Sequence, residues 1–127
     1  RRGSYLGTND DAHFLRMEGR EVFRHAVTKL PRSIQLVCAR GGVTLADVDW
    51  FVAHQANQRI NEAVCNKLGV PAEKMPSNID RFGNTSGATI PILIDEMRRD
   101  GRWQQGQLVC VTALGAGFHW GSMLLRT

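Results

Sequence analysis

The stretch VAHQANQRI, residues 52–60, places several hydrogen-bonding side chains directly after an apolar run. His54 follows the residues DWFVA, and Asn84 stands in the turn-forming segment IDRFGNTSG. A neutral imidazole N–H and a carboxamide NH2 are both uncharged hydrogen-bond donors. If both donors face one crevice, they can stabilise an oxyanion or enolate that develops on a carbonyl oxygen. The small residues of LGAG, residues 114–117, allow close backbone approach and could offer an N–H to a second oxyanion.

Residue types alone leave a structural role open for both side chains. A single histidine at a strand end is commonly a hydrogen-bonded structural residue. An asparagine within Gly-Asn-Thr is commonly a turn former. Whether His54 and Asn84 have a structural or a catalytic role therefore depends on where the helices and strands place them.

Helical spacing of apolar residues begins at Gly19 and continues to Val37. Pro31 interrupts this pattern, so we expect it to kink the helix or to split it in two. Gly41 and Gly42 are expected to end it, and Thr44 is a candidate N-cap for one short turn.

A short buried strand is predicted over residues 49–53, followed by a helix over residues 57–68. Ser86 is the expected N-cap of a further helix, in which Pro91 should cost a hydrogen bond. Residues 107–113 are expected to form a strand, and residues 118–126 a returning strand after a tight turn.

Alternation of helices and strands predicts an α/β protein with a mixed sheet that ends in a hairpin. Reactive groups in open α/β sheets collect beyond the carboxyl ends of strands. His54 and Asn84 could therefore face one crevice at that edge.

The bulk properties of the 127 residues fit one domain or half of a duplicated one. No run of eighteen apolar residues occurs, so no membrane span is expected. The net charge of +4 is spread along the chain, which does not favour nucleic-acid binding. The three cysteines are widely spaced and lack CxxC pairing, so we expect buried free thiols in a reducing compartment, the cytoplasm, and no metal site.

Four ordered motifs resemble the β-ketoacyl-acyl carrier protein synthase III family, whose members initiate bacterial fatty acid synthesis. HQAN-x-RI at 54–60 resembles its histidine motif, and GNTSGATIP at 83–91 resembles its asparagine motif. MEGREVF at 17–23 and ALGAGFHWGS at 113–122 also match in order and spacing. The resemblance extends over residues 15–126, nearly the whole chain.

This resemblance implies a thiolase-like fold with α/β/α/β/α layers built from two related halves. Residues 15–127 would form most of the C-terminal half, a mixed sheet flanked by helices. Residues 1–14 would be a loop that leads from the N-terminal half.

The resemblance also implies a reaction, the decarboxylative condensation of an acyl group from acyl-CoA with malonyl-acyl carrier protein. His54 and Asn84 would hydrogen-bond the malonyl thioester carbonyl, and the backbone N–H of Ala116 would contribute to an oxyanion hole. The family's cysteine nucleophile lies in the N-terminal half, and no cysteine of this chain stands in a matching motif. Two departures from the family pattern are Ala116, where glycine is common, and Leu114, where an aromatic residue is common.

Further residues are implied as contacts of substrates and partners. The pantetheine tunnel of coenzyme A would be lined by Gly19, Phe23, Ala56 and Asn57. The patch that docks acidic acyl carrier protein would consist of Arg24, Arg59 and Lys67. The implied protein is a cytoplasmic homodimer completed by its N-terminal half, with coenzyme A thioester as substrate, no permanently bound cofactor and no metal.

Several other interpretations stay open. Within the fold, the alternatives are a type III polyketide synthase, a priming or ester-forming enzyme of secondary metabolism, and a noncatalytic partner subunit. The HQAN motif and the ALGAGF turn favour synthase III over a type III polyketide synthase. A noncatalytic subunit would tend to lose His54 or Asn84. A papain-like hydrolase also combines Cys, His and Asn, but the α/β pattern does not resemble one.

Overall fold

The computed structural model describes residues 18–127. Its helices are α1 (Gly19–Arg40), α2 (Gln58–Leu68), α3 (Ile79–Phe82) and α4 (Thr89–Arg99). Its strands are β1 (Trp50–Ala53), β2 (Leu108–Gly115) and β3 (His119–Arg126). Three short 3-10 turns lie between them: η2 (Leu45–Asp47), η3 (Ala72–Lys74) and η4 (Ser86–Ala88).

The three strands form one mixed sheet in the order β1-β2-β3, which confirms the prediction. β1 pairs with β2 in parallel, with Phe51 opposite Cys110. A parallel pair needs a crossover connection, and the segment that carries α2, α3 and α4 supplies it. β2 and β3 form the expected antiparallel hairpin, with Gly115 opposite His119 at its end.

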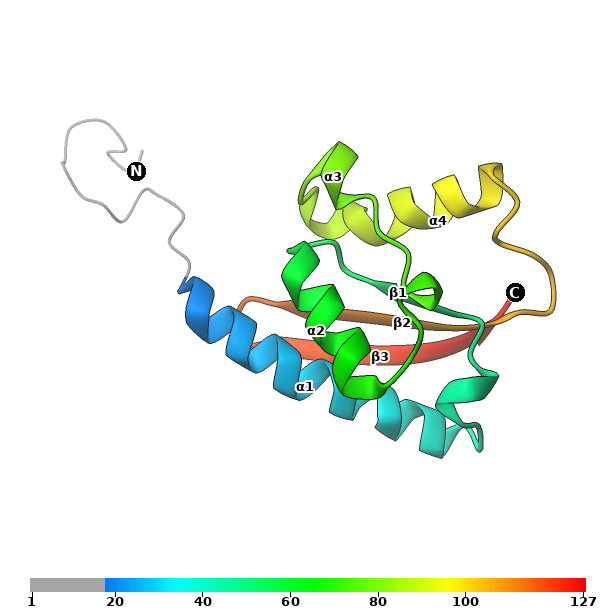
Figure 1. Ribbon diagram of the computed structural model, residues 1–127, viewed down its shortest axis with the longest axis horizontal. Coiled ribbons are helices and arrows are strands. Elements are labelled where there is room, and N and C mark those ends of the chain that lie inside the picture. Colours follow the sequence, from blue (N-terminus) through cyan, green and yellow to red (C-terminus); the bar gives the residue numbers. More distant parts are fainter. Residues whose placement is uncertain (1–17) are drawn as a thin grey trace, which may run out of the picture.

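Helices cover both faces of the sheet (Figure 1). Phe51 and Cys110 belong to the core that packs under α1 and α2, whereas Val52 and Val109 belong to the core under α4. This alternation follows the two-residue period of a strand, which sends successive side chains to opposite faces. The fold is therefore a three-layer arrangement of helices, sheet and helix.

Helix α1 is continuous through Pro31, so of the two expected outcomes, a kink or a split, the split is excluded. Proline inside a helix costs about 3 kcal/mol because it removes one hydrogen bond and crowds the preceding turn. The stripe of Ala26, Leu30, Ile34 and Cys38 is buried on both sides of Pro31, and Pro31 itself is buried. Burial of a large apolar side chain contributes about 1.5–3 kcal/mol, so this stripe outweighs the cost of one proline.

The start of α4 also differs from the prediction. Ser86 is not an N-cap but the first residue of η4, and α4 begins at Thr89. Pro91 is then the third residue of the helix, where a backbone N–H has no partner within the helix. Pro91 therefore costs no intrahelical hydrogen bond, contrary to the expectation.

Two smaller predictions are confirmed. The Thr44 backbone N–H donates to the Asp47 carboxylate at 2.7 Å, which closes the expected turn. α2 ends at Leu68, as expected, and its C-cap Gly69 has a φ of 67°, in the left-handed region that favours glycine. Among residues 18–127, no helix is long and apolar enough to cross a membrane.

Candidate functional site

A cavity of about 560 Å³ opens beyond the carboxyl end of β1. The His54 backbone N–H donates to the Thr112 carbonyl at 2.9 Å, which extends the β1–β2 pairing to the cavity edge. The hairpin turn between β2 and β3 lies on the same side of the molecule as the beginnings of α1, α2 and α4 (Figure 1). The cavity, called the His54 cavity below, is lined by His54, Asn84, Ser86, Gly87, Thr89, Ile90, Ala113, Leu114, Gly115 and Ala116.

The imidazole of His54 is partly buried at this cavity. Its Nδ1 lies 2.6 Å from Oγ1 of Thr89, the first residue of α4. Burial lowers the pKa of His54 below its ordinary value, since the charged form loses hydration. At neutral pH the ring is therefore an uncharged imidazole.

Asn84 lies in the loop between α3 and η4, with its carboxamide orientation fixed by the backbone. Its Oδ1 accepts a hydrogen bond from the Ser86 backbone N–H at 2.9 Å. The amide oxygen is thereby engaged, which leaves the NH2 group as the donor for a ligand. The structure thus brings both sequence-predicted donors, His54 and Asn84, to one cavity.

The loop that carries Asn84 has unusual backbone geometry. Gly83 has a φ of 65° and a ψ of −160°, a conformation open essentially to glycine alone. Ser86 has a φ of 55° and is the only non-glycine residue with positive φ among residues 18–127. Such a conformation costs on the order of 1–3 kcal/mol and is typically retained at functional sites.

The same loop is held from behind by a polar cluster between α3 and α4. The Asn78 side chain, 2% exposed, donates through Nδ2 to Glu96 Oε2 at 2.9 Å. Arg81 forms an ion pair with the other oxygen of Glu96. The hydrogen bond from Asn78, followed by that from Arg81, lowers the pKa of Glu96 below its usual range.

Gln55 fixes the chain directly after His54. It is fully buried, and its Nε2 donates to the Ala53 carbonyl at 2.8 Å. Its Oε1 accepts from Ser77 Oγ at 2.8 Å and from the Asn78 backbone N–H at 3.3 Å. These contacts join the His54 segment to the α3 segment.

The hairpin turn brings Ala116 to the cavity wall. Gly117 has a φ of 114°, but Ala116 does not have positive φ. Alanine at this position therefore fits without backbone strain. Phe118 stacks on His25 of α1 with ring centroids 4.3 Å apart, which ties the turn to the helix layer.

The residues expected to contact coenzyme A do not line the His54 cavity. Gly19 and Phe23 are exposed in the first turns of α1, and Ala56 is half-buried. Asn57 is the N-cap of α2, and its Oδ1 accepts from the Arg59 backbone N–H at 2.9 Å. The observed contact of Asn57 is thus a helix cap, and a ligand contact for these four residues stays a prediction.

The three basic residues expected to dock the carrier protein are all exposed. Arg59 lies in the first turn of α2 and Lys67 in its last turn. Arg24 forms an exposed ion pair with Glu21 of its own helix at 2.5 Å. Their exposure is compatible with a docking patch, and the partner stays a prediction.

The three cysteines are buried and free, as predicted. Burial, with a smaller contribution from Cys38, raises the pKa of the Cys110 thiol to about 12. Burial also raises the pKa values of Cys38 and Cys65. Burial and a raised pKa are typical of structural cysteines, whereas a nucleophilic thiol needs a lowered pKa.

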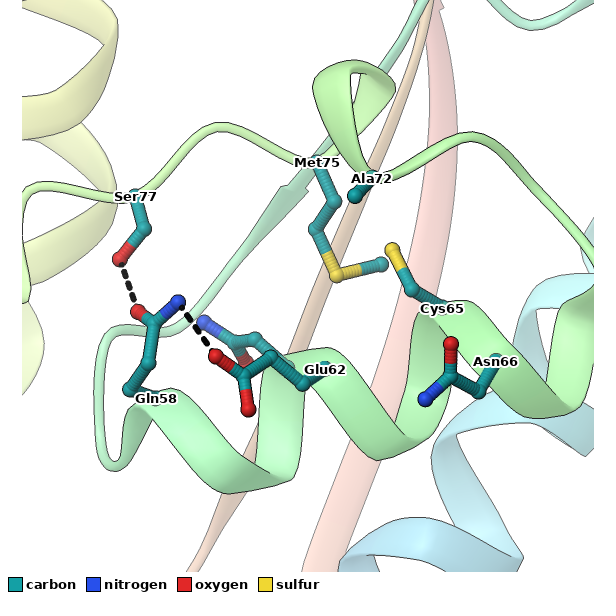
Figure 2. A pocket seen from close by; sticks show the side chains of 8 residues that line it. Gln58, Glu62, Cys65, Asn66, Ala72, Met75 and Ser77 are labelled. Carbon is teal, nitrogen blue, oxygen red and sulfur yellow. Dashed lines mark hydrogen bonds between the residues drawn. The ribbon is translucent and has the colours of Figure 1, made fainter.

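A smaller hollow of about 210 Å³ lies between α2 and η3 and shares no lining residue with the His54 cavity. Figure 2 shows Ser77, Gln58 and Glu62 linked in a row along its rim. Ser77 Oγ lies 2.8 Å from Gln58 Oε1 as well as from Gln55 Oε1, so its single proton serves one of them at a time. Gln58 Nε2 donates to Glu62 Oε1 at 3.1 Å. Asn61 also lines the hollow, and its buried Nδ2 has no hydrogen-bond partner among the described residues.

Sequence reasoning missed Thr89 and the Asn78–Glu96 contact. Thr89 stands 35 positions from His54, and Glu96 stands 18 positions from Asn78. No local pattern joins such pairs; only the predicted start of a helix near Asn84 could have indicated Thr89.

Comparisons with known proteins match this chain to the C-terminal part of one protein family. The family model for the C-terminal part of 3-oxoacyl-[acyl-carrier-protein (ACP)] synthase III matches residues 38–127. The β-ketoacyl-[acyl-carrier-protein] synthase III of Bordetella petrii is 52% identical over 113 residues, covering 89% of this chain and 34% of that protein.

Solved structures agree. The 3-oxoacyl-[acyl-carrier-protein] synthase III of Aquifex aeolicus VF5 is 41% identical with a TM-score of 0.89, covering 93% of this chain and 38% of that chain. The priming β-ketosynthase of the R1128 polyketide biosynthetic pathway is 32% identical with a TM-score of 0.80. The match covers 87% of this chain and 34% of that chain.

The mixed sheet between helix layers and these structural neighbours define a thiolase-like fold. Within that class, the chain belongs to the 3-oxoacyl-[acyl-carrier-protein] synthase III family and matches its C-terminal part. It spans between 34% and 38% of the length of the three proteins named above.

Proposed function

We propose that the protein containing this chain condenses an acyl group, delivered by acyl-CoA, with malonyl-acyl carrier protein and so initiates fatty acid synthesis. The observation that carries the proposal is the placement of His54 and Asn84 on the wall of one cavity. Family membership supports it, since the relatives bear the name of this synthase.

In the proposed reaction, His54 and Asn84 donate hydrogen bonds to the carbonyl oxygen of the malonyl thioester. The bond between the malonyl α-carbon and its carboxylate breaks, carbon dioxide leaves, and the electron pair forms an enolate. Each donor is worth about 2.7–4 kcal/mol, because it meets a charge that develops only during reaction. The enolate carbon then attacks the enzyme-bound acyl thioester, and the cysteine thiolate is expelled.

The cysteine nucleophile is proposed to lie outside this chain, since burial raises the pKa values of all three cysteines here. A thiol at a helix N-terminus, in the rest of the protein, would be activated by the helix dipole. The Ala116 backbone N–H would stabilise the oxyanion on the acyl thioester. No permanently bound cofactor is required by these steps.

The proposal extends to partners and setting. Gly19, Phe23, Ala56 and Asn57 would contact coenzyme A on its path to the cavity. The exposed cations Arg24, Arg59 and Lys67 would attract acidic carrier protein. The proposed assembly is a cytoplasmic homodimer.

The test separates acylation from condensation in the full-length protein. His54→Ala and Asn84→Ala should each lower the condensation rate about 100- to 1000-fold, yet leave acylation by acyl-CoA intact. Asn66→Ala is the matched control, because Asn66 is exposed in the last turn of α2 and lines no part of the His54 cavity. Normal condensation by both cavity variants would refute the enolate role.

A polyketide-priming condensation is the second candidate, favoured by the 32% identity to a priming β-ketosynthase. Both candidates use the same donors and differ in the acyl group and in the carrier protein. Parallel assays with acetyl-CoA and with longer or branched acyl-CoA, each with fatty acid and polyketide carrier proteins, would distinguish them.

A further inference from the structure

The hydroxyl of Thr89 is the closest polar contact of the His54 ring, with Oγ1 2.6 Å from Nδ1. Thr89 is 2% exposed and opens α4. We propose that Thr89 is a positioning residue that holds His54 in the neutral tautomer with its proton on Nε2. This inference rests on the proposed function, since it specifies how His54 becomes a donor to the thioester carbonyl.

The proton count of the contact decides the tautomer. A hydroxyl carries one proton, and a neutral imidazole carries one N–H. In one arrangement the Thr89 hydroxyl donates to Nδ1, and Nε2 carries the ring proton. In the other, Nδ1–H donates to Oγ1, and the hydroxyl proton must find another acceptor.

The second arrangement is disfavoured by burial. Among the described residues, Thr89 Oγ1 has no hydrogen-bond partner besides His54. Because Thr89 is 2% exposed, an unpaired hydroxyl proton there would disfavour this arrangement by about tenfold or more in population. In the first arrangement the Thr89 hydroxyl proton is paired with Nδ1. The remaining donor, Nε2–H, belongs to a ring that lines the open cavity.

The surroundings keep the ring uncharged. No other residue that lines the His54 cavity carries an ionisable side chain. The N-terminus of α4, at Thr89, presents the positive end of a helix dipole, which opposes protonation of the imidazole. A carboxylate at Nδ1 would instead accept a hydrogen bond from Nδ1–H and favour an imidazolium. A hydroxyl carries no charge and does not favour the imidazolium in this way.

The experiment uses the full-length protein with ¹⁵N-labelled histidine. Ring ¹⁵N spectra report which nitrogen of His54 carries the proton, with His54→Ala as the assignment control. Thr89→Val keeps the branched shape and removes the hydroxyl, and Thr89→Ser restores it. Acylation and condensation rates are measured separately for each variant.

We expect the wild-type proton on Nε2 at neutral pH. Thr89→Val should move part of the population to Nδ1–H and lower condensation about 10- to 100-fold, the size of effect that follows loss of an orienting partner at metal-bound histidines. Acylation should be unchanged, and Thr89→Ser should restore both the tautomer and the rate. A merely structural role would not move the tautomer.

A wild-type proton on Nδ1 would overturn the inference, even if Thr89→Val failed to fold. An unchanged tautomer or an unchanged condensation rate in a folded Thr89→Val protein would overturn it as well. Normal condensation by His54→Ala would instead refute the proposed function. The ring spectra of the wild-type protein test the tautomer independently of that result.

Discussion

His54 and Asn84 each enter the cavity with one polar atom already engaged. His54 Nδ1 contacts Thr89, and Asn84 Oδ1 accepts from the Ser86 backbone. In both cases a local contact selects the donor group for the ligand. The sequence motifs singled out His54 and Asn84, but the contacts that orient them come from residues brought near by folding.

The lowered pKa of His54 predicts a pH dependence of stability. A folded-state pKa below the unfolded value of about 6.5 means that the unfolded chain binds the proton more readily. The contribution of neutral His54 is therefore fully present above about pH 6.5 and is lost as the pH falls toward the folded pKa.

Denaturant unfolding of the full-length protein at pH 7.5 and 5.5 measures this effect. The wild-type protein should lose more stability between these pH values than His54→Gln, which has no titrating ring. Equal losses in the two proteins would show that burial does not disfavour the charged imidazole.

At the scale of elements, the site depends on four segments that meet at one edge of the sheet. β1 delivers His54, the α3–η4 loop delivers Asn84, α4 delivers Thr89 and the hairpin turn delivers Ala116. Periodicity predicted β1, α2 and the hairpin, because each has a local signal. It failed at Ser86, where an unusual backbone conformation replaces the expected N-cap. At Pro31 it left a split helix open, which the burial of a long apolar stripe excludes.

Glu96 gives an element-scale prediction, since it links α4 to the segment before the Asn84 loop. Glu96→Ala would leave the Nδ2 of Asn78, a residue that is 2% exposed, without its acceptor. We expect a loss of about 1–3 kcal/mol in the free energy of unfolding and slower condensation. Denaturant unfolding and steady-state kinetics of the full-length protein provide the measurement.

Asp95→Ala is the matched control on the neighbouring position. Asp95 pairs with Arg99 at 2.8 Å in an exposed i,i+4 ion pair, worth no more than about 0.5 kcal/mol. If both variants lose equal stability, the cluster around Glu96 does not anchor the loop.

At the scale of the whole molecule, residues 18–127 form one α/β/α unit. The four motifs predicted the family, and the comparisons confirm it. The chain itself contains no cysteine with a lowered pKa, and it spans 34% of its Bordetella petrii relative. The proposed reaction therefore requires residues that lie elsewhere in the protein.

The polypeptide of residues 1–127 alone should form no product from acetyl-CoA and malonyl-acyl carrier protein. Intact mass after incubation with acetyl-CoA should show no acyl group on Cys38, Cys65 or Cys110, because burial raises the pKa of each thiol. Addition of the remaining N-terminal portion should restore turnover. Turnover by residues 1–127 alone would contradict the assignment of the nucleophile to the rest of the protein.

The most direct measurement of the central claim is a crystal structure of the full-length protein with a malonyl thioester analogue that cannot decarboxylate. We predict that His54 Nε2 and Asn84 Nδ2 both lie about 2.7–3.1 Å from the same thioester carbonyl oxygen. This prediction would be contradicted if the two side chains bound different oxygens, or if either turned away from the ligand.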